Sequence, residues 1–195
     1  MSDKPAGVVG AGSFGTAVAN MLASKTHVLL YARKHEAVDA IRQTGTSQGQ
    51  RLHPNIEATS DLQLLGKSCE VIFPVVPSEN FLEMIRTMSP FLKPYHILIH
   101  GTKGLYVDAD LSDHKRPLLT DQVYTMSGLI RKESLVVRVG CLAGPNLSKE
   151  LADQQPAATV VASHFDEVIR EGQRLLRSER FQVYGSRDIH GVELA

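Results

Sequence analysis

The sequence predicts an α/β fold, a doubly wound and mostly parallel sheet with helices on both faces. Apolar runs of strand length alternate with amphipathic stretches of helical periodicity, a pattern typical of βαβ units. The first apolar run leads directly into a glycine-rich turn, and helix-forming residues follow at once. Because 43% of the 195 residues are hydrophobic, the chain can bury a substantial core.

Seven strands are expected where short apolar runs end at turn residues or helix starts. They span 6–10, 27–31, 71–75, 96–100, 136–142, 159–162 and 180–184. The run at 6–10 leaves no room for an earlier strand, so we expect it to be the first strand of the sheet. A shorter strand is expected over 55–59, followed by a turn that Asp61 caps.

Five helices are expected between these strands. They span 14–23, 35–43, 79–88, 146–153 and 166–177. In the third of them the apolar residues, which include Phe81, Ile85 and Met88, fall on one face, and Ser78 precedes it as a good N-cap. The least regular stretch is 106–134, where a charged segment leads to an expected helix over 120–130. We interpret it as a solvated excursion between strands.

The composition argues against several classes of partner. Lys and Arg total 21, as do Asp and Glu, so no net charge favours nucleic acid or an anionic membrane. No stretch reaches the roughly 20 apolar residues of a membrane span, and no signal peptide is evident. Cys69 and Cys141 are expected to be buried reduced thiols, and no spacing of Cys and His indicates a metal site. We therefore expect a soluble cytoplasmic protein.

The most informative motif is Gly-x-Gly-x-x-Gly directly after the first strand. Gly10 permits a tight turn, Gly12 leaves space for a pyrophosphate, and Gly15 lets the next helix pack closely. The free N–H groups and the positive end of the helix dipole favour phosphate at this point. The motif predicts a Rossmann-type dinucleotide-binding turn, and the alternative is a purely structural glycine turn.

Positive charge follows the second strand. A site selective for NAD usually has Asp or Glu about 20 residues beyond the glycines, where it accepts a hydrogen bond from the ribose. This chain has Arg33 and Lys34 at that strand tip, whereas Glu36 and Asp39 come later and are expected to face out of a helix. The two cations favour the 2′-phosphate of NADP, or the use of both cofactors. The alternative is two ordinary surface cations.

The tips of the later strands carry further polar loops. Lys103 lies between two glycines, where its ammonium can reach a substrate oxygen or an anionic group, and the alternative is a solvated loop lysine. Val76-Pro77-Ser78 either belongs to a cofactor-binding loop or is an ordinary connection between a strand and a helix. His100 is expected to be the polar end of a buried strand. After 136–142, a Gly-Pro turn leads to Asn146, which we expect to cap the next helix. Because the carboxyl ends of parallel strands meet at one edge, these loops should line one cleft.

Taken in order, these loops resemble bacterial glycerol-3-phosphate dehydrogenase, the NAD(P)-dependent enzyme of phospholipid precursor synthesis. The matching segments are Gly-Ala-Gly-Ser-Phe-Gly-Thr-Ala (10–17), Tyr-Ala-Arg (31–33), Val-Pro-Ser (76–78), Thr-Lys-Gly (102–104), Ala-Gly-Pro-Asn (143–146), Phe-Gln-Val-Tyr (181–184) and the stretch 188–194. The resemblance implies interconversion of glycerol 3-phosphate and dihydroxyacetone phosphate by hydride transfer with NADP or NAD.

The resemblance also implies roles for individual residues. The residues that would contact the cofactor, in addition to the three glycines, are Ser13, Phe14, Arg33, Lys34, Lys103 and Ser148. Gly144 and Asn146 would lie by the substrate together with Lys103, which would also polarise the carbonyl oxygen as a catalytic residue.

The resemblance implies a cofactor domain over 1–187, with 188–195 as the start of a helix leading to a second, all-helical domain. In the family a general acid/base lysine follows that point, so we expect this chain to bind dinucleotide with negligible turnover. A homodimer through an exposed apolar face is a further expectation. The alternatives are another two-domain dehydrogenase of hydroxy or keto acids, or a dinucleotide-sensing domain without catalysis.

Overall fold

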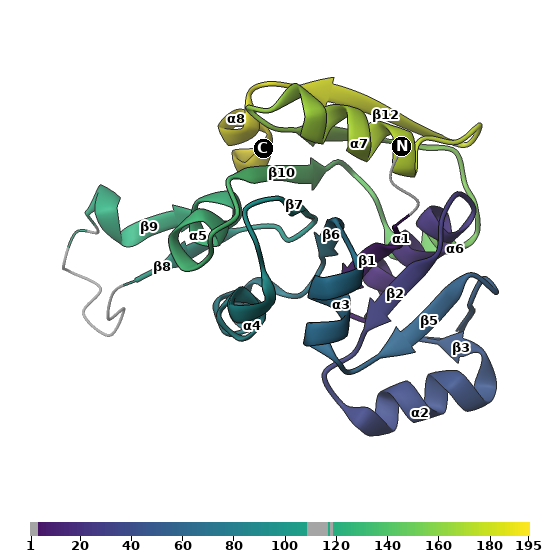
Figure 1. Ribbon diagram of the computed structural model, residues 1–195. Helices are drawn as coiled ribbons and strands as arrows, with labels where there is room; N and C mark the ends of the chain where they lie inside the picture. The colour runs from purple at the N-terminus through teal and green to yellow at the C-terminus, as the bar shows by residue number, and fades with distance from the viewer. Residues whose placement is uncertain (1–3, 109–116, 118) are drawn as a thin grey trace.

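A single large sheet runs through the centre of the fold (Figure 1). The computed structural model describes residues 4–108, 117 and 119–195. In this part of the chain, eight strands form the sheet in the order β12 (Phe181–Ser186), β11 (Ala157–Ala162), β10 (Arg138–Ala143), β7 (Ile97–His100), β6 (Val71–Pro74), β1 (Ala6–Val9), β2 (Val28–Tyr31) and β5 (Ile56–Thr59). Neighbouring strands are parallel except β10 and β11, so the predicted mostly parallel sheet is confirmed.

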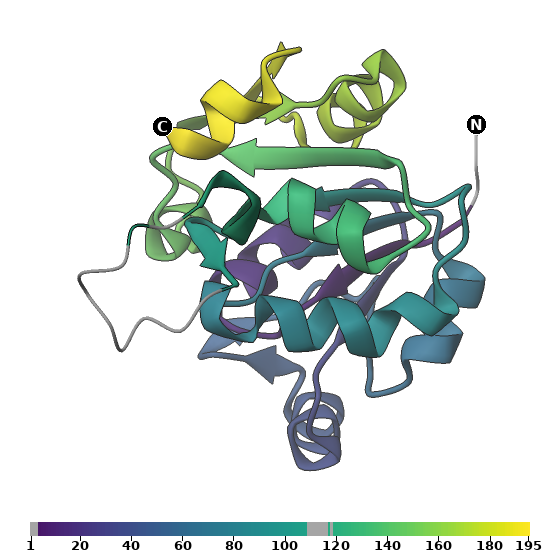
Figure 2. The same cartoon turned by 90° about the vertical axis from the view of Figure 1, so that its left-hand side faces the viewer.

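Helices cover both faces of this sheet, as predicted. One face packs against α1 (Ser13–Ala23), α6 (Ser148–Ala152) and α7 (Asp166–Leu176). The other packs against α3 (Leu62–Ser68), α4 (Phe81–Met88) and α5 (Met126–Glu133). Figure 2 shows α4 and α5 lying side by side in front of the sheet. This arrangement is that of a Rossmann-type fold.

Two further helices lie at the edges of the fold. Helix α2 (His35–Thr44) packs near the β5 edge through Val38 and Ile41. Helix α8 (Ile189–Leu194) packs against β10 and β11 through Ile189, close to the carboxyl end of β10 (Figure 2). Among the described residues, no helix combines the length and the apolar character needed to cross a membrane.

Short elements complete the described chain. Two small hairpins pair β3 (Thr46–Ser47) with β4 (Gln50–Arg51) and β8 (Leu105–Val107) with β9 (Val123–Thr125). Turns of 3₁₀ helix occupy η1 (Ser78–Asn80), η2 (Ser89–Phe91) and η3 (Thr120–Gln122).

The predicted helix over 120–130 is wrong in its first half. Residues 123–125 form β9, and α5 begins only at Met126, where Thr125 caps it by accepting from the Gly128 N–H. Val123, Tyr124 and Thr125 are β-branched or aromatic and pair with β8, which outweighs the local helical pattern. The excursion is also less solvated than predicted, because α5 contributes to the core. Much of its charged segment, 109–116, lies outside the described residues.

Two predicted helix caps are also wrong. Ser78 lies in η1, and α4 begins three residues later at Phe81 without a side-chain cap. Asn146 lies before Leu147, the actual N-cap of α6, and its amide donates instead to Thr159. The predicted cap at Asp61 is confirmed, since its carboxylate accepts from two N–H groups of α3 at 2.8 and 3.0 Å.

Both cysteines are buried, as predicted. Cys69 and Cys141 are free thiols, and burial is the main cause that raises the pKa of each to about 12. Such thiols are poor nucleophiles at neutral pH. They pack as small apolar side chains and take no part in the site described below.

Candidate functional site

The glycine turn between β1 and α1 has the geometry that its sequence predicts. Gly10 has a φ of +121°, and a Cβ there would lie 2.6 Å from the carbonyl oxygen of Val75. A Cβ on Gly15 would overlap the carbonyl oxygen of Gly10, so α1 approaches the turn more closely than any side chain allows. Around Gly12 nothing lies within 4 Å of a built Cβ, which leaves its backbone open to a ligand.

The N-terminus of α1 faces this open space. Gly12 is its N-cap, without a side-chain cap bond, and the first turn of this 11-residue helix carries no acidic residue. Ser13 is exposed at the same end. The first N–H groups of the helix and the positive end of its dipole therefore remain available to an anion.

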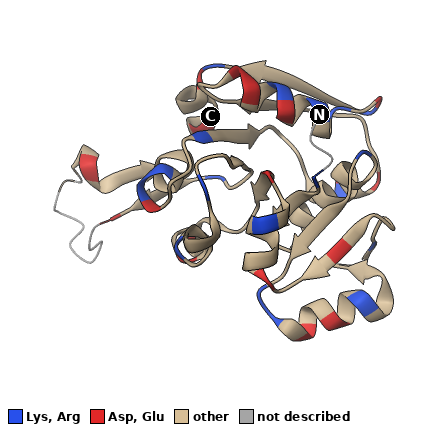
Figure 3. Ribbon diagram, in the orientation of Figure 1, with Lys and Arg blue, Asp and Glu red and all other residues tan. Residues whose placement is uncertain are grey.

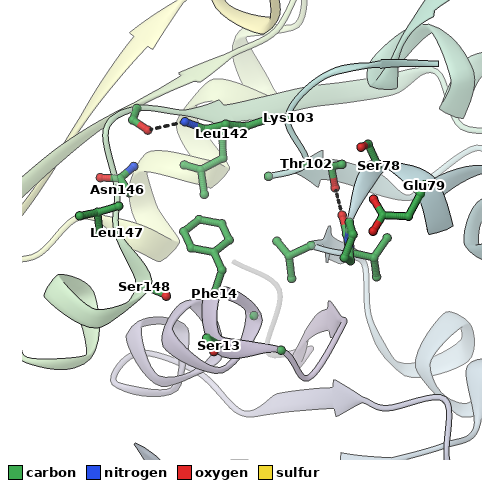
Figure 4. A pocket seen from close by; sticks show the side chains of 17 residues that line it. Ser13, Phe14, Ser78, Glu79, Thr102, Lys103, Leu142, Asn146, Leu147 and Ser148 are labelled. Carbon is green, nitrogen blue, oxygen red and sulfur yellow. Dashed lines mark hydrogen bonds between the residues drawn. The ribbon is translucent and has the colours of Figure 1, made fainter. Parts of the chain in front are cut away.

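The central cavity, of about 560 Å³, opens beside this helix end (Figure 4). It brings together loops from four strand tips. The predicted site residues that line it are Gly12, Ser13, Phe14, Gly15, Lys103, Gly144, Asn146 and Ser148. Val76, Pro77 and Ser78 also line it, so the loop after β6 joins the cleft. The convergence expected from the sheet topology is confirmed.

The ring of Phe14 projects from α1 into the central cavity, toward Leu142 (Figure 4). It packs against the loop after β7, where a Cβ on Gly101 would lie only 2.9 Å from the ring. Phe14 therefore gives the cavity an apolar floor between the glycine turn and the loop that carries Lys103.

Lys103 lies at the rim of the central cavity. Its Nζ is 3.4 Å from the carbonyl oxygen of Gly144, at the long end of hydrogen bonding, and its side chain is exposed. The preceding Thr102 is nearly buried and donates to the carbonyl oxygen of Val76 at 2.7 Å. The backbone of this loop is thus fixed, while the ammonium can move to a closer acceptor.

Asn146 carries an unsatisfied polar atom at the same cavity. Its Nδ2 donates to Thr159 Oγ1 at 3.0 Å, and that hydroxyl donates to the carbonyl oxygen of Ala143 at 2.9 Å. These bonds fix the amide plane. Its Oδ1 is buried and has no hydrogen-bond partner among the described residues. A buried acceptor of this kind favours a ligand that brings a donor, such as a hydroxyl group.

A second cavity of about 540 Å³, the β2 cavity, lies on the other side of the turn. Gly10, Gly12, Arg33 and Lys34 line it, and Gly12 lines both cavities. Arg33 and Lys34 are exposed at the tip of β2. Glu36 and Asp39 are exposed on α2, as predicted.

Sequence reasoning missed two contributors to the β2 cavity. Gln48, in the β3–β4 hairpin, lines it and donates to the carbonyl oxygen of Ala11 at 3.3 Å. The signal was the pair Gly45 and Gly49, whose φ values of +64° and +75° are those of a tight turn. The second contributor is Glu83 of α4, whose carboxylate lies 3.7 Å from the Arg33 guanidinium.

A buried hydrogen-bonded pair, His100 and Glu193, joins the end of β7 to α8. His100 and Glu193 have side chains only 2% and 4% exposed, and His100 Nε2 lies 2.9 Å from Glu193 Oε1. Ser127 donates to the same carboxylate from its N–H at 2.8 Å and its hydroxyl at 2.5 Å. Burial opposes ionisation of Glu193, but its bonds with His100 and Ser127 outweigh it and lower its pKa. The sequence placed His100 at a buried strand end but did not reveal its partner from α8.

Comparison with known proteins identifies the family. The sequence profile described as "NAD-dependent glycerol-3-phosphate dehydrogenase N-terminus" matches residues 5–169. The chain belongs to this family. The resemblance inferred from the loops is therefore confirmed at the level of the glycerol-3-phosphate dehydrogenase N-terminal region.

Individual glycerol-3-phosphate dehydrogenases are similar over the whole chain. The NAD(P)+ enzyme of Saccharophagus degradans is 37% identical over 192 residues, which is 96% of this chain and 50% of the relative. That of Acinetobacter baylyi is 35% identical, with the same coverage of 96% and 50%. The crystal structure of the Coxiella burnetii glycerol-3-phosphate dehydrogenase is 28% identical with a TM-score of 0.82, and the match covers 97% of this chain and 56% of that one. The chain spans about half the length of the curated relatives it matches.

Proposed function

We propose that this chain binds NADP or NAD as the cofactor domain of a glycerol-3-phosphate dehydrogenase. The observation that carries the proposal is the position of Gly12 between the central cavity and the β2 cavity. A dinucleotide has two halves joined by a pyrophosphate, and here two cavities meet at an open helix N-terminus. The proposed domain spans 1–187, and 188–195 form the start of the connection to a substrate domain.

The residues of each cavity suit one half of the cofactor. Gly12 and Ser13 would bind the pyrophosphate through their N–H groups, and Arg33 and Lys34 would face the adenosine ribose from the β2 cavity. The nicotinamide half would enter the central cavity, which Phe14, Lys103 and Ser148 line. When bound, the dinucleotide supplies or accepts the hydride. The protein would hold it in place.

The substrate would enter the same cavity beside Lys103. In the reduction of dihydroxyacetone phosphate, the Lys103 ammonium would donate to the carbonyl oxygen and stabilise the negative charge that develops there. The unpartnered Oδ1 of Asn146 would accept from a substrate hydroxyl, and the backbone at Gly144 would line the other side. Lys103 would thus orient and polarise the substrate at the carbon that receives the hydride.

In a full-length enzyme that carries this domain, Lys103→Met is expected to lower kcat/KM for dihydroxyacetone phosphate by about 10²–10³-fold, because a transition-state donor is lost. Dinucleotide affinity should change far less. The matched control is Lys149→Met, an exposed lysine of α6 outside the residues that line the central cavity. An unchanged kcat/KM in Lys103→Met would remove this lysine from the mechanism.

The proposed binding is tested by titrating the purified chain with NADH and NADPH while nicotinamide fluorescence is recorded. We expect saturable binding that Gly12→Ala weakens strongly, since a methyl group there occupies the space left for the pyrophosphate. Absence of binding for both dinucleotides would contradict the proposed function of this chain.

A further inference from the structure

The cationic rim of the β2 cavity carries a carboxylate that comes from a distant helix. Glu83 lies in the first turn of α4, and its Oε2 is 3.7 Å from Nη1 of Arg33 at the tip of β2. Both side chains line the β2 cavity. Acidic and basic residues are otherwise interspersed along the ribbon (Figure 3).

Contribution to stability is a weak explanation of this pair. The side chains of Arg33 and Glu83 are 69% and 70% exposed, and ion pairs this exposed contribute little to the free energy of folding. On the same helix, Arg86 binds Glu133 at 2.8 and 3.2 Å, so it is already engaged by another carboxylate. The negative charge of Glu83 therefore acts mainly on Arg33 and on a ligand that enters the β2 cavity beside it.

The negative charge of Glu83 is expected to affect the binding of NADP and the binding of NAD differently. NADP carries a 2′-phosphate of about −1.5 to −2 charges. This phosphate is attracted to the Arg33 guanidinium and repelled by the Glu83 carboxylate next to it. NAD presents a ribose hydroxyl there instead, which can donate to a carboxylate. Dehydrogenases selective for NAD usually place that carboxylate at the tip of the second strand, where this chain has Ala32-Arg33-Lys34. Glu83 offers the same chemistry from α4, beside Arg33.

We propose that Glu83 is a specificity-determining residue of the cofactor site, which restrains the preference for NADP that Arg33 and Lys34 create. The inference rests on the proposed dinucleotide binding. In the presence of Glu83, a 2′-phosphate must share Arg33 with a carboxylate or displace it, whereas a ribose hydroxyl gains an acceptor. The chain therefore binds both cofactors with similar affinity.

The test is to measure the Kd values of NADPH and NADH for the wild-type chain and for Glu83→Gln. Glutamine keeps the size of the side chain and, at an exposed helix position, leaves the fold intact. We expect the wild-type values to lie within about tenfold of each other. In Glu83→Gln, we expect the Kd of NADPH to fall by about tenfold, while that of NADH stays the same or rises a few-fold.

Glu36→Gln is the matched control, because Glu36 is an exposed carboxylate in the first turn of α2 and is not among the residues that line the β2 cavity. It removes one negative charge from the same region, and we expect the ratio of the two Kd values to stay as in the wild type. An unchanged ratio in Glu83→Gln, or an equal shift in both variants, would overturn the inference alone. If the wild-type chain bound neither dinucleotide, the proposed function would fail and the inference with it.

Discussion

Replacing Gly15 with alanine is expected to destabilise the domain by about 3 kcal/mol or more and to abolish dinucleotide binding. The added Cβ would overlap the carbonyl oxygen of Gly10, which belongs to the backbone of the turn. A backbone atom cannot move aside by a change of rotamer, so α1 must shift away from β1. Urea unfolding followed by circular dichroism measures the loss in free energy of unfolding.

Gly12→Ala is the control that separates folding from binding at the same turn. Gly12 has a φ of −78°, which alanine adopts readily, and nothing lies within 4 Å of its built Cβ. We expect its free energy of unfolding to fall by about 1 kcal/mol or less, since the position is an N-cap, while dinucleotide binding is strongly weakened. Wild-type stability in Gly15→Ala would contradict the close approach of α1 to the turn.

Glu193→Ala is expected to lower the free energy of unfolding by about 3 kcal/mol, measured by urea unfolding at pH 7. The substitution leaves His100 Nε2 and both donors of Ser127 buried without their acceptor. His100 Nδ1 is already buried without a partner among the described residues, so the ring would lose its one recorded hydrogen bond. A loss in free energy of unfolding below about 1 kcal/mol would contradict this prediction, because it would mean that the contact of α8 with β10 contributes little to stability.

The same carboxylate predicts a pH dependence. The pKa of folded Glu193 is below its ordinary value because its bonds with His100 and Ser127 outweigh the burial that opposes ionisation. A depressed carboxyl pKa stabilises the fold above the pKa of the unfolded chain, about 4.3, and this contribution disappears as the pH falls through the folded pKa. The stability difference between wild type and Glu193→Gln should therefore shrink as the pH is lowered from 6 to 3. A difference that is constant or grows with acid would contradict the assignment.

The sequence predicts the sheet and the glycine turn because both depend on local patterns. Short apolar runs and the spacing of Gly10, Gly12 and Gly15 determine a strand, a turn and a helix within ten residues. The convergence of Lys103 and Asn146 on one cavity also follows, since parallel strands place their carboxyl ends at one edge.

The predictions that failed depend on contacts between distant residues. The local pattern of residues 123–125 predicts a helix. In the structure these residues pair with β8, which lies on the other side of the charged segment in the sequence. The sequence around Asn146 predicts a helix cap. In the structure the Asn146 amide donates instead to Thr159, 13 residues away. The pairing of His100 with Glu193 joins residues 93 positions apart, and no periodicity in the sequence indicates it.

The central claim is that the glycine turn joins two cavities into one dinucleotide site. Its most direct test is to record backbone amide NMR spectra of the labelled chain while NADPH is added. We predict the largest shift changes at Gly10 to Phe14 and at Arg33 and Lys34, with smaller ones at Lys103 and none along β12. Changes confined to the region around α8, or no changes at saturating NADPH, would contradict the claim.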